Sequence, residues 1–142
     1  MTARRRRMLW LWSLFALVLT QLSLGLAMAA HLPIVANHGI AFGLLAKAGV
    51  LPLLLEATGV VLVLLAARLW PSPWLWPEAI TIGGAIGNLL DRIGLGAVPD
   101  PLHLSPYPYS FNLADLLIRL GLIVWLVSLA VAALRRRNAQ PR

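Results

Sequence analysis

The chain has 142 residues, of which 60% are hydrophobic and 12% are charged, and its net charge is +7. This composition excludes a water-soluble domain of this size and indicates that a lipid bilayer surrounds the chain. Because the chain has no cysteine, disulfides, thiolate chemistry and cysteine-ligated zinc are excluded as well.

Four apolar stretches are long enough to form transmembrane helices, each of which needs about 20 residues. They cover, approximately, residues 8–30, 45–69, 77–95 and 112–134. The sequence therefore predicts an all-α integral membrane protein. We expect four transmembrane helices with short extracytoplasmic loops, in a single membrane domain over residues 1–142.

The first stretch imitates a secretory signal peptide. Arginines occupy positions 4–7 before it, and Ala27-Met28-Ala29 near its end resembles a cleavage site. Its apolar run is longer than the roughly 7 to 15 residues of a signal-peptide core, so we expect an uncleaved first helix. In the outer segment that follows, residues 31–44, Asn37-His38-Gly39 predicts a turn, and the apolar residues 40–43 are expected to re-enter the membrane interface.

The middle of the chain contains one deep charge and one small-residue motif. Glu56 lies within the second stretch, where an unpaired charge is costly, so we expect Arg119 to pair with Glu56, with Asp115 or with both. Gly83 and Gly87 form a G-x-x-x-G pattern, which lets helices approach closely. We expect this face to pack inside the bundle and not against a second copy, and therefore predict a monomer.

The positive charges are concentrated at the ends of the predicted helices. Arginines occupy positions 4–7, 68, 135–137 and 142. Since cytoplasmic loops are enriched in Lys and Arg, both termini and the turn around residues 70–76 are expected on the cytoplasmic side. The tryptophans at 70, 74 and 76 suit the headgroup level. Membrane lipids are therefore expected partners, and nucleic-acid binding is not expected.

Polar residues gather at the opposite, outer end of the bundle. Residues 96–111 contain prolines at 99, 101, 106 and 108, which prevent a helix and favour an extended, rigid loop. Asp91, Asp100 and Asp115 map to this end, from the third helix, the loop and the fourth helix. Two carboxylates held close together cannot both ionise cheaply, so Asp100 and Asp115 could act as acid and base on a water molecule. Asp91, beside Arg92, is expected to be structural and to brace that arginine.

Three blocks of sequence resemble the signature blocks of the lipoprotein signal peptidases, also called signal peptidase II. They are Asn37-His38-Gly39-Ile40-Ala41-Phe42, Gly83-Gly84-Ala85-Ile86-Gly87-Asn88-Leu89-Leu90-Asp91-Arg92 and Phe111-Asn112-Leu113-Ala114-Asp115. Their order and helix placement match the family, from Asn37 to Gly121.

The resemblance implies an aspartic endopeptidase of the bacterial inner membrane. It removes signal peptides from diacylglyceryl-modified prolipoproteins by cutting before the lipidated cysteine. The catalytic dyad implied is Asp100, in Val98-Pro99-Asp100, and Asp115; the substrate-binding and supporting residues implied are Asn37, Asn88, Arg92 and Asn112. No metal or other cofactor is expected, and the three histidines are too dispersed for a zinc site.

The sequence departs from the family pattern in two places. The family has an aspartate and, four residues later, a lysine late in the first helix, whereas residues 20–24 here lack both charges. The outer segment before Asn37, which folds as a small β cradle in relatives, is shortened to a few residues. The departures leave open an inactive relative that binds lipoprotein precursors. A small transporter is disfavoured, because the acids gather at one end and form no path across the bilayer.

Overall fold

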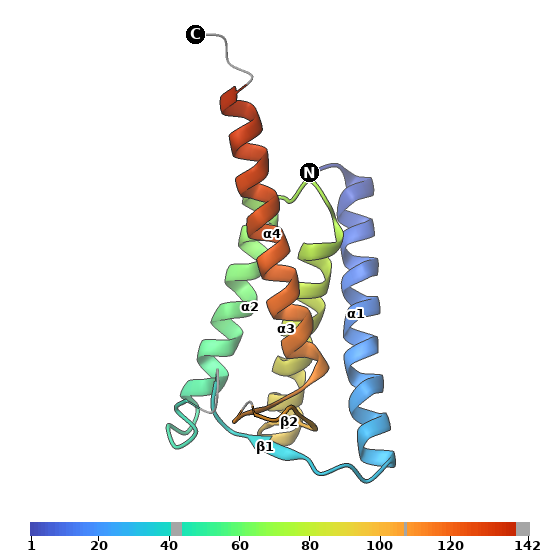
Figure 1. Ribbon diagram of the computed structural model, residues 1–142, viewed down its shortest axis with the longest axis vertical. Coiled ribbons are helices and arrows are strands. Elements are labelled where there is room, and N and C mark those ends of the chain that lie inside the picture. The colour runs from blue at the N-terminus through green and yellow to red at the C-terminus, as the bar shows by residue number, and fades with distance from the viewer. Residues whose placement is uncertain (41–43, 107, 139–142) are drawn as a thin grey trace.

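The computed structural model describes residues 1–40, 44–106 and 108–138. Four helices and four short strands follow one another along the chain (Figure 1): α1 (Ala3–Ala29), β1 (Val35–Asn37), α2 (Leu51–Leu69), α3 (Trp76–Leu95), β2 (Val98–Asp100), β3 (Leu102–His103), β4 (Ser110–Phe111) and α4 (Leu113–Asn138). The helices run along the long axis, with the strands at one end and the start of α1 and the end of α4 toward the other.

The predicted membrane-type helical fold is confirmed. By length and apolarity, α1, α2 and α4 could each cross a membrane. The remaining helix, α3, packs against all three of the others and carries several buried polar side chains, among them Thr81 and Asn88. That α3 also spans the membrane, as the sequence predicts, remains a prediction.

Glycines bring α3 close to its neighbours. A side chain at Gly83 would collide with the backbone of Ser13 in α1, and one at Gly87 would meet the hydroxyl of Thr20, also in α1, at 2.8 Å. Gly84 faces the other way, where an added carbon would lie 2.9 Å from the carbonyl oxygen of Ala114 in α4. The prediction that this small-residue face packs inside the bundle is therefore confirmed.

The second helix begins later than predicted, at Leu51 instead of about residue 45. Leu45 and Gly49 both adopt positive φ, at 62° and 59°, so the chain turns there. Pro52 then occupies the first turn of α2, where its missing N–H costs nothing. Apolar composition alone did not show this boundary. The predicted re-entrant piece falls on residues 41–43, which lie outside the described residues.

Two small antiparallel sheets close the end of the bundle that was predicted to be the outer one. β1 pairs with β2, with Val35 opposite Asp100 and Asn37 opposite Val98. β3 pairs with β4, with Leu102 opposite Phe111. The proline-rich loop is thus extended and not helical in its described part, as predicted. The first sheet places the loop before α2 directly over the loop after α3.

A buried ion pair fastens the opposite end. The carboxylate of Glu78, at the start of α3, is 0% exposed and accepts hydrogen bonds from Arg5 of α1, at 3.0 Å, and from the backbone N–H of Ser72. The hydroxyl of Ser72 also lies 2.9 Å from that of Ser128 in α4. These contacts connect α1, the α2–α3 turn and α4 around one buried charge.

Replacing Gly83 by alanine should destabilise the protein, because the new carbon meets backbone that cannot rotate away. Overpacking of this kind costs about 1–3 kcal/mol. Gly94, on the same helix, has open space around it, so Gly94→Ala is a matched control that should change stability little or raise it slightly. Thermal unfolding in detergent measures both, and equal melting temperatures for the two variants would contradict the packing described here.

Candidate active site

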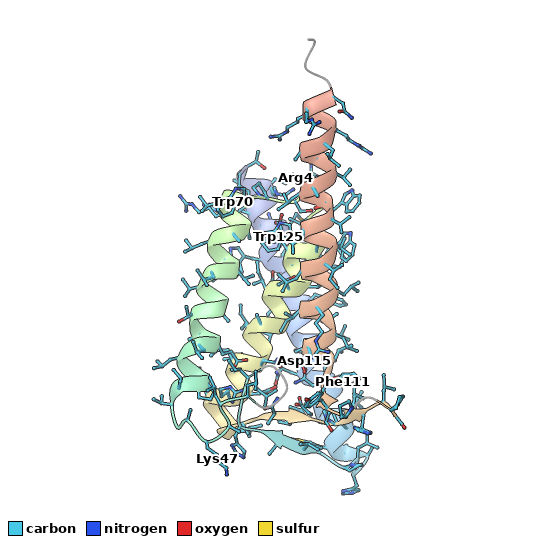
Figure 2. The ribbon with its side chains drawn as sticks, turned by 60° about the vertical axis from the view of Figure 1, so that its left-hand side comes forward. Arg4, Lys47, Trp70, Phe111, Asp115 and Trp125 are labelled. Carbon is cyan, nitrogen blue, oxygen red and sulfur yellow. The ribbon has the colours of Figure 1, made fainter. Side chains whose placement is uncertain are left out.

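The polar residues singled out in the sequence come together beneath the outer sheets. They are Asn37 on β1, Asn88 and Arg92 on α3, Asp100 on β2, and Asn112 and Asp115 at the start of α4. Figure 2 shows Asp115 and Phe111 at the opposite end of the molecule from Arg4 and Trp70. The site therefore lies at one end of the helices.

Asn112 connects the two aspartates to the start of α4. Its side-chain oxygen accepts a hydrogen bond from the backbone N–H of Asp115, at 2.9 Å, and the carboxylate of Asp115 accepts one from the backbone N–H of Asn112, at 3.3 Å. This reciprocal pattern is a helix cap. The amide nitrogen of the same side chain donates to Asp100 Oδ1, at 3.0 Å. One residue thus fixes both carboxylates.

Asn88 provides a second bridge between the same groups. Its amide nitrogen donates to Asp115 Oδ1, at 2.9 Å, and its oxygen accepts from the amide nitrogen of Asn112, at 3.1 Å. Both oxygens of Asp115 are therefore hydrogen-bonded at the N-terminus of a helix, a setting that suits a negative charge.

Asp100 is held from its other side by β1. The amide nitrogen of Asn37 donates to Asp100 Oδ2, at 3.1 Å, while the oxygen of Asn37 accepts from the backbone N–H of Gly39, at 3.0 Å. The turn predicted at residues 37–39 therefore aims the Asn37 amide at the carboxylate. With Asn112, this gives each oxygen of Asp100 one amide donor.

Burial sets the charge state of Asp100, whose residue is 2% exposed. Desolvation, with a further contribution from the charge of Asp115, raises the pKa of Asp100 from 3.8 to about 6, against the opposing effects of Asn37, Asn112 and Arg92. A carboxyl group with a pKa near 6 can both hold and release a proton near neutral pH, as general acid–base catalysis requires.

Arg92 binds Glu56 of α2 and not Asp91, its neighbour in sequence. Its Nε donates to Glu56 Oε2, at 2.5 Å, and its Nη2 donates to the carbonyl oxygen of Gly39, at 2.6 Å. The expectation that Asp91 braces Arg92 is wrong, because adjacent helix residues point in different directions. Asp91 instead borders a small cavity beside Thr20 of α1.

Glu56 is the site residue that the sequence did not assign to the cluster. Its charge in an apolar helix correctly indicated an ion pair. The structure pairs Glu56 with Arg92, whereas the pairing of Arg119 with Glu56, with Asp115 or with both stays a prediction. Glu56 and Arg92 are 36 positions apart in the sequence, and only the packing of α2 against α3 brings them together.

Two cavities border the aspartate pair, one beside each aspartate. One, of about 250 Å³, is lined by Asn37, Gly39, Ile40, Leu55, Glu56, Asn88, Arg92, Val98 and Asp115. The other, of about 360 Å³, is lined by Val35, Ala36, Asn37, His38, Ala46, Asp100, His103, Pro108, Tyr109 and Ser110. Asp115 borders the first and Asp100 the second, and Asn37 borders both.

Fold and site together define a multi-pass membrane protein with a pair of aspartates, one of them deeply buried, linked by amide side chains at one end of its helices. The family model described as signal peptidase (SPase) II matches residues 8–131. The chain therefore belongs to the signal peptidase II family.

Individual relatives agree with this assignment. The lipoprotein signal peptidase of Methylorubrum extorquens is 36% identical over 127 residues, which cover 81% of this chain and 71% of the relative. Those of Caldanaerobacter subterraneus and Moorella thermoacetica are 38% and 41% identical, each over 66% of this chain. These alignments span 66% and 64% of the two relatives, so the chain matches just under two thirds of their length.

Solved structures show the same fold. A bacterial membrane enzyme structure superposes with a TM-score of 0.66 at 19% identity, covering 93% of this chain and 90% of the other. A second bacterial membrane enzyme structure gives a TM-score of 0.61 at 19% identity, over 87% and 90% of the chains.

The raised pKa of Asp100 predicts a specific pH dependence of stability. Between pH 3.8 and about 6 the folded chain keeps a proton that the unfolded chain releases. The stabilisation from this proton is complete below the lower value and is lost as the pH rises through about 6. Asp100→Asn cannot titrate. The stability of the wild type relative to this variant should therefore fall as the pH rises from 4 to 7, by up to about 3 kcal/mol.

Melting temperatures of both proteins in detergent at several pH values measure this difference. The other acidic residues are common to the two proteins, so their direct contributions cancel. A difference that is constant with pH, or that grows in favour of the wild type, would contradict the burial of Asp100.

Proposed function

We propose that this protein is an aspartic endopeptidase that removes signal peptides from diacylglyceryl-modified bacterial prolipoproteins, hydrolysing the peptide bond before the lipidated cysteine. The observation that carries the proposal is the linkage of Asp100 and Asp115 through Asn112 and Asn88, in a chain of the signal peptidase II family. Asp100 and Asp115 form the catalytic dyad, and the amides with Arg92 position it.

The environments of the two aspartates suggest different roles. Asp100, with its raised pKa, holds the proton and donates it to the oxygen of the scissile carbonyl. Asp115, at the N-terminus of α4, is the base that takes a proton from water, whose oxygen attacks the carbonyl carbon. The product is a neutral tetrahedral diol, with no covalent link to the enzyme.

Collapse of this intermediate restores the resting state. Asp115 returns its proton to the nitrogen of the leaving amine as the C–N bond breaks. Asp100 takes the proton of one hydroxyl as the new carboxyl carbonyl forms. Each aspartate thus ends in its starting state, and Asn37 and Asn112 keep the Asp100 carboxyl in place throughout.

The proposed substrate suits a site at the end of membrane helices. A diacylglyceryl group is confined to the bilayer, so its attachment beside the scissile bond holds that bond near the dyad and replaces a bimolecular encounter by proximity. The first cavity has apolar walls at Ile40 and Leu55 on its α2 side. This side is the one suited to the lipid-bearing part of the substrate.

The inactive-binder alternative rests on the missing charges of α1 and the shortened outer segment. That segment still supplies β1, which pairs with β2, the strand that carries Asp100. Asp100 is only 2% exposed. A transporter is disfavoured because Glu56 belongs to the same cluster as the aspartates and Glu78 lies at the far end in an ion pair. The carboxylates therefore lie toward the two ends of the bundle and do not form a path of acidic groups across it.

We further propose that the protein acts as a monomer in the bacterial cytoplasmic (inner) membrane, with both termini in the cytoplasm and the dyad on the opposite side. The arginines near the termini support this orientation. Alkaline phosphatase inserted after Ser105 should be active, and the same enzyme fused after Arg137 should be inactive. A fluorescent protein that folds only in the cytoplasm is the reciprocal control, and the reverse pattern would overturn the topology.

The dyad is tested by cleavage of a lipidated precursor with purified variants. Asp100→Asn and Asp115→Asn should each reduce turnover by roughly a hundredfold to ten-thousandfold, because an amide cannot take or share the proton. Asp91→Asn makes the same chemical change outside the dyad, so it should keep substantial activity. The double variant should lose little more than either single one.

The unlipidated precursor serves as the substrate control and should be cut far more slowly by the wild type. Melting temperatures show whether each variant is folded. If folded Asp91→Asn were inactive while Asp100→Asn kept near-normal turnover, the dyad would have to be reassigned to Asp91 and Asp115. A folded wild-type protein that binds but never cleaves the lipidated precursor would favour the inactive-binder alternative.

A further inference from the structure

A cavity of about 400 Å³ lies at the other end of the bundle, remote from the aspartates. It is formed by α1 and α2, with α3 behind them. Its lining residues are Met1, Arg6, Leu9, Trp10, Leu64, Ala67, Arg68 and Ile82. None of these residues takes part in the proposed reaction.

The cavity combines an apolar floor with a basic rim. Leu9, Ala67 and Ile82 are buried members of the apolar core and form the floor. Arg6 on α1 and Arg68 on α2 are exposed and contribute one positive charge from each side. An occupant that matches both parts has an anionic head and an apolar body.

The positive charge of this rim is not balanced within the described residues. The chain has five acidic side chains. The three aspartates lie at the outer end, Glu56 is paired with Arg92, and Glu78 is paired with Arg5. Within the described ranges, neither Arg6 nor Arg68 has a carboxylate partner. Both guanidinium groups are therefore available to an anion from outside the chain.

Tryptophans place the cavity at the depth of lipid headgroups. Trp70, Trp74 and Trp76, in and beside the α2–α3 turn, are exposed close to Arg68 in sequence, and indole rings prefer the membrane–water interface. Figure 2 shows Trp70 and Arg4 at this same end. Arginines can lie along apolar surface with the guanidinium group at this level.

We propose that the cavity binds one anionic phospholipid, with its phosphate between Arg6 and Arg68 and its acyl chains against the floor formed by Leu9, Ala67 and Ile82. The signal segment of a substrate is a poor alternative occupant, because such segments begin with positive charge and this rim would repel them. A free phosphate ion would make no use of the apolar floor.

Native mass spectrometry of the full chain in detergent tests the proposal. Phosphatidylglycerol and phosphatidylcholine with identical acyl chains are the two probes. The wild type should retain one phosphatidylglycerol in preference to phosphatidylcholine. Arg6→Gln combined with Arg68→Gln should weaken phosphatidylglycerol binding by about tenfold or more and leave phosphatidylcholine binding unchanged.

The matched control is Arg135→Gln combined with Arg136→Gln, which removes the same charge from the end of α4. It should bind phosphatidylglycerol within about twofold of the wild type, since its positions do not line the cavity. Arg6→Lys with Arg68→Lys keeps both charges and should restore most of the binding. Inorganic phosphate should not displace the lipid.

Melting temperatures give an independent measurement. Phosphatidylglycerol should raise the melting temperature of the wild type and of the control more than that of the Arg6/Arg68 glutamine variant. If the double variant does not fold, Arg68→Gln alone should show a partial loss of binding. The proposal would be overturned if the wild type retained the two lipids equally. It would also be overturned if the α4 control lost as much phosphatidylglycerol binding as the Arg6/Arg68 glutamine variant.

Discussion

The side chain of Asn112 satisfies two demands with one amide group. Its oxygen caps α4, and its nitrogen reaches the buried carboxyl of Asp100. A helix that starts without a cap leaves N–H groups unsatisfied, and a buried carboxyl without donors is costly. By meeting both needs, Asn112 ties the position of Asp115, in the first turn of α4, to the position of Asp100 on β2. The relative position of the two aspartates therefore depends on local helix capping.

The central helix α3 carries a polar anchor at each end. At its start, Glu78 is buried and bound by Arg5; near its other end, Asn88 and Arg92 are bound to the aspartate cluster and to Glu56. Between them, glycines bring α1 and α4 close to its backbone. Polar groups in a bilayer have no water to satisfy them, and the side chains of Glu78, Asn88 and Arg92 are each hydrogen-bonded within the protein. The pairs at the two ends fix how the helices align along their length.

The two ends of the bundle are suited to different contacts with the membrane. The outer end joins an aspartate pair to two cavities, one of which has apolar walls toward α2. The basic end has a cavity with an apolar floor and two arginines that lack carboxylate partners in the described chain. The two glutamates form ion pairs with Arg5 and Arg92, and the three aspartates lie toward the other end of the helices, so the basic end has no carboxylate paired with Arg6 or Arg68 in the described chain.

The sequence by itself determined the bilayer environment, the helical fold, the inward face of Gly83 and Gly87, and the gathering of the aspartates toward one end of the helices. These properties depend on composition and short-range spacing, which are local. The tertiary structure alone decided that Arg92 binds Glu56 and not Asp91, and that the Asn37 amide reaches Asp100. It also decided that Arg6 and Arg68 share a cavity. Each of these contacts joins segments that are tens of residues apart, and a choice among several charged or amide partners at such separations is made by how the helices and strands pack.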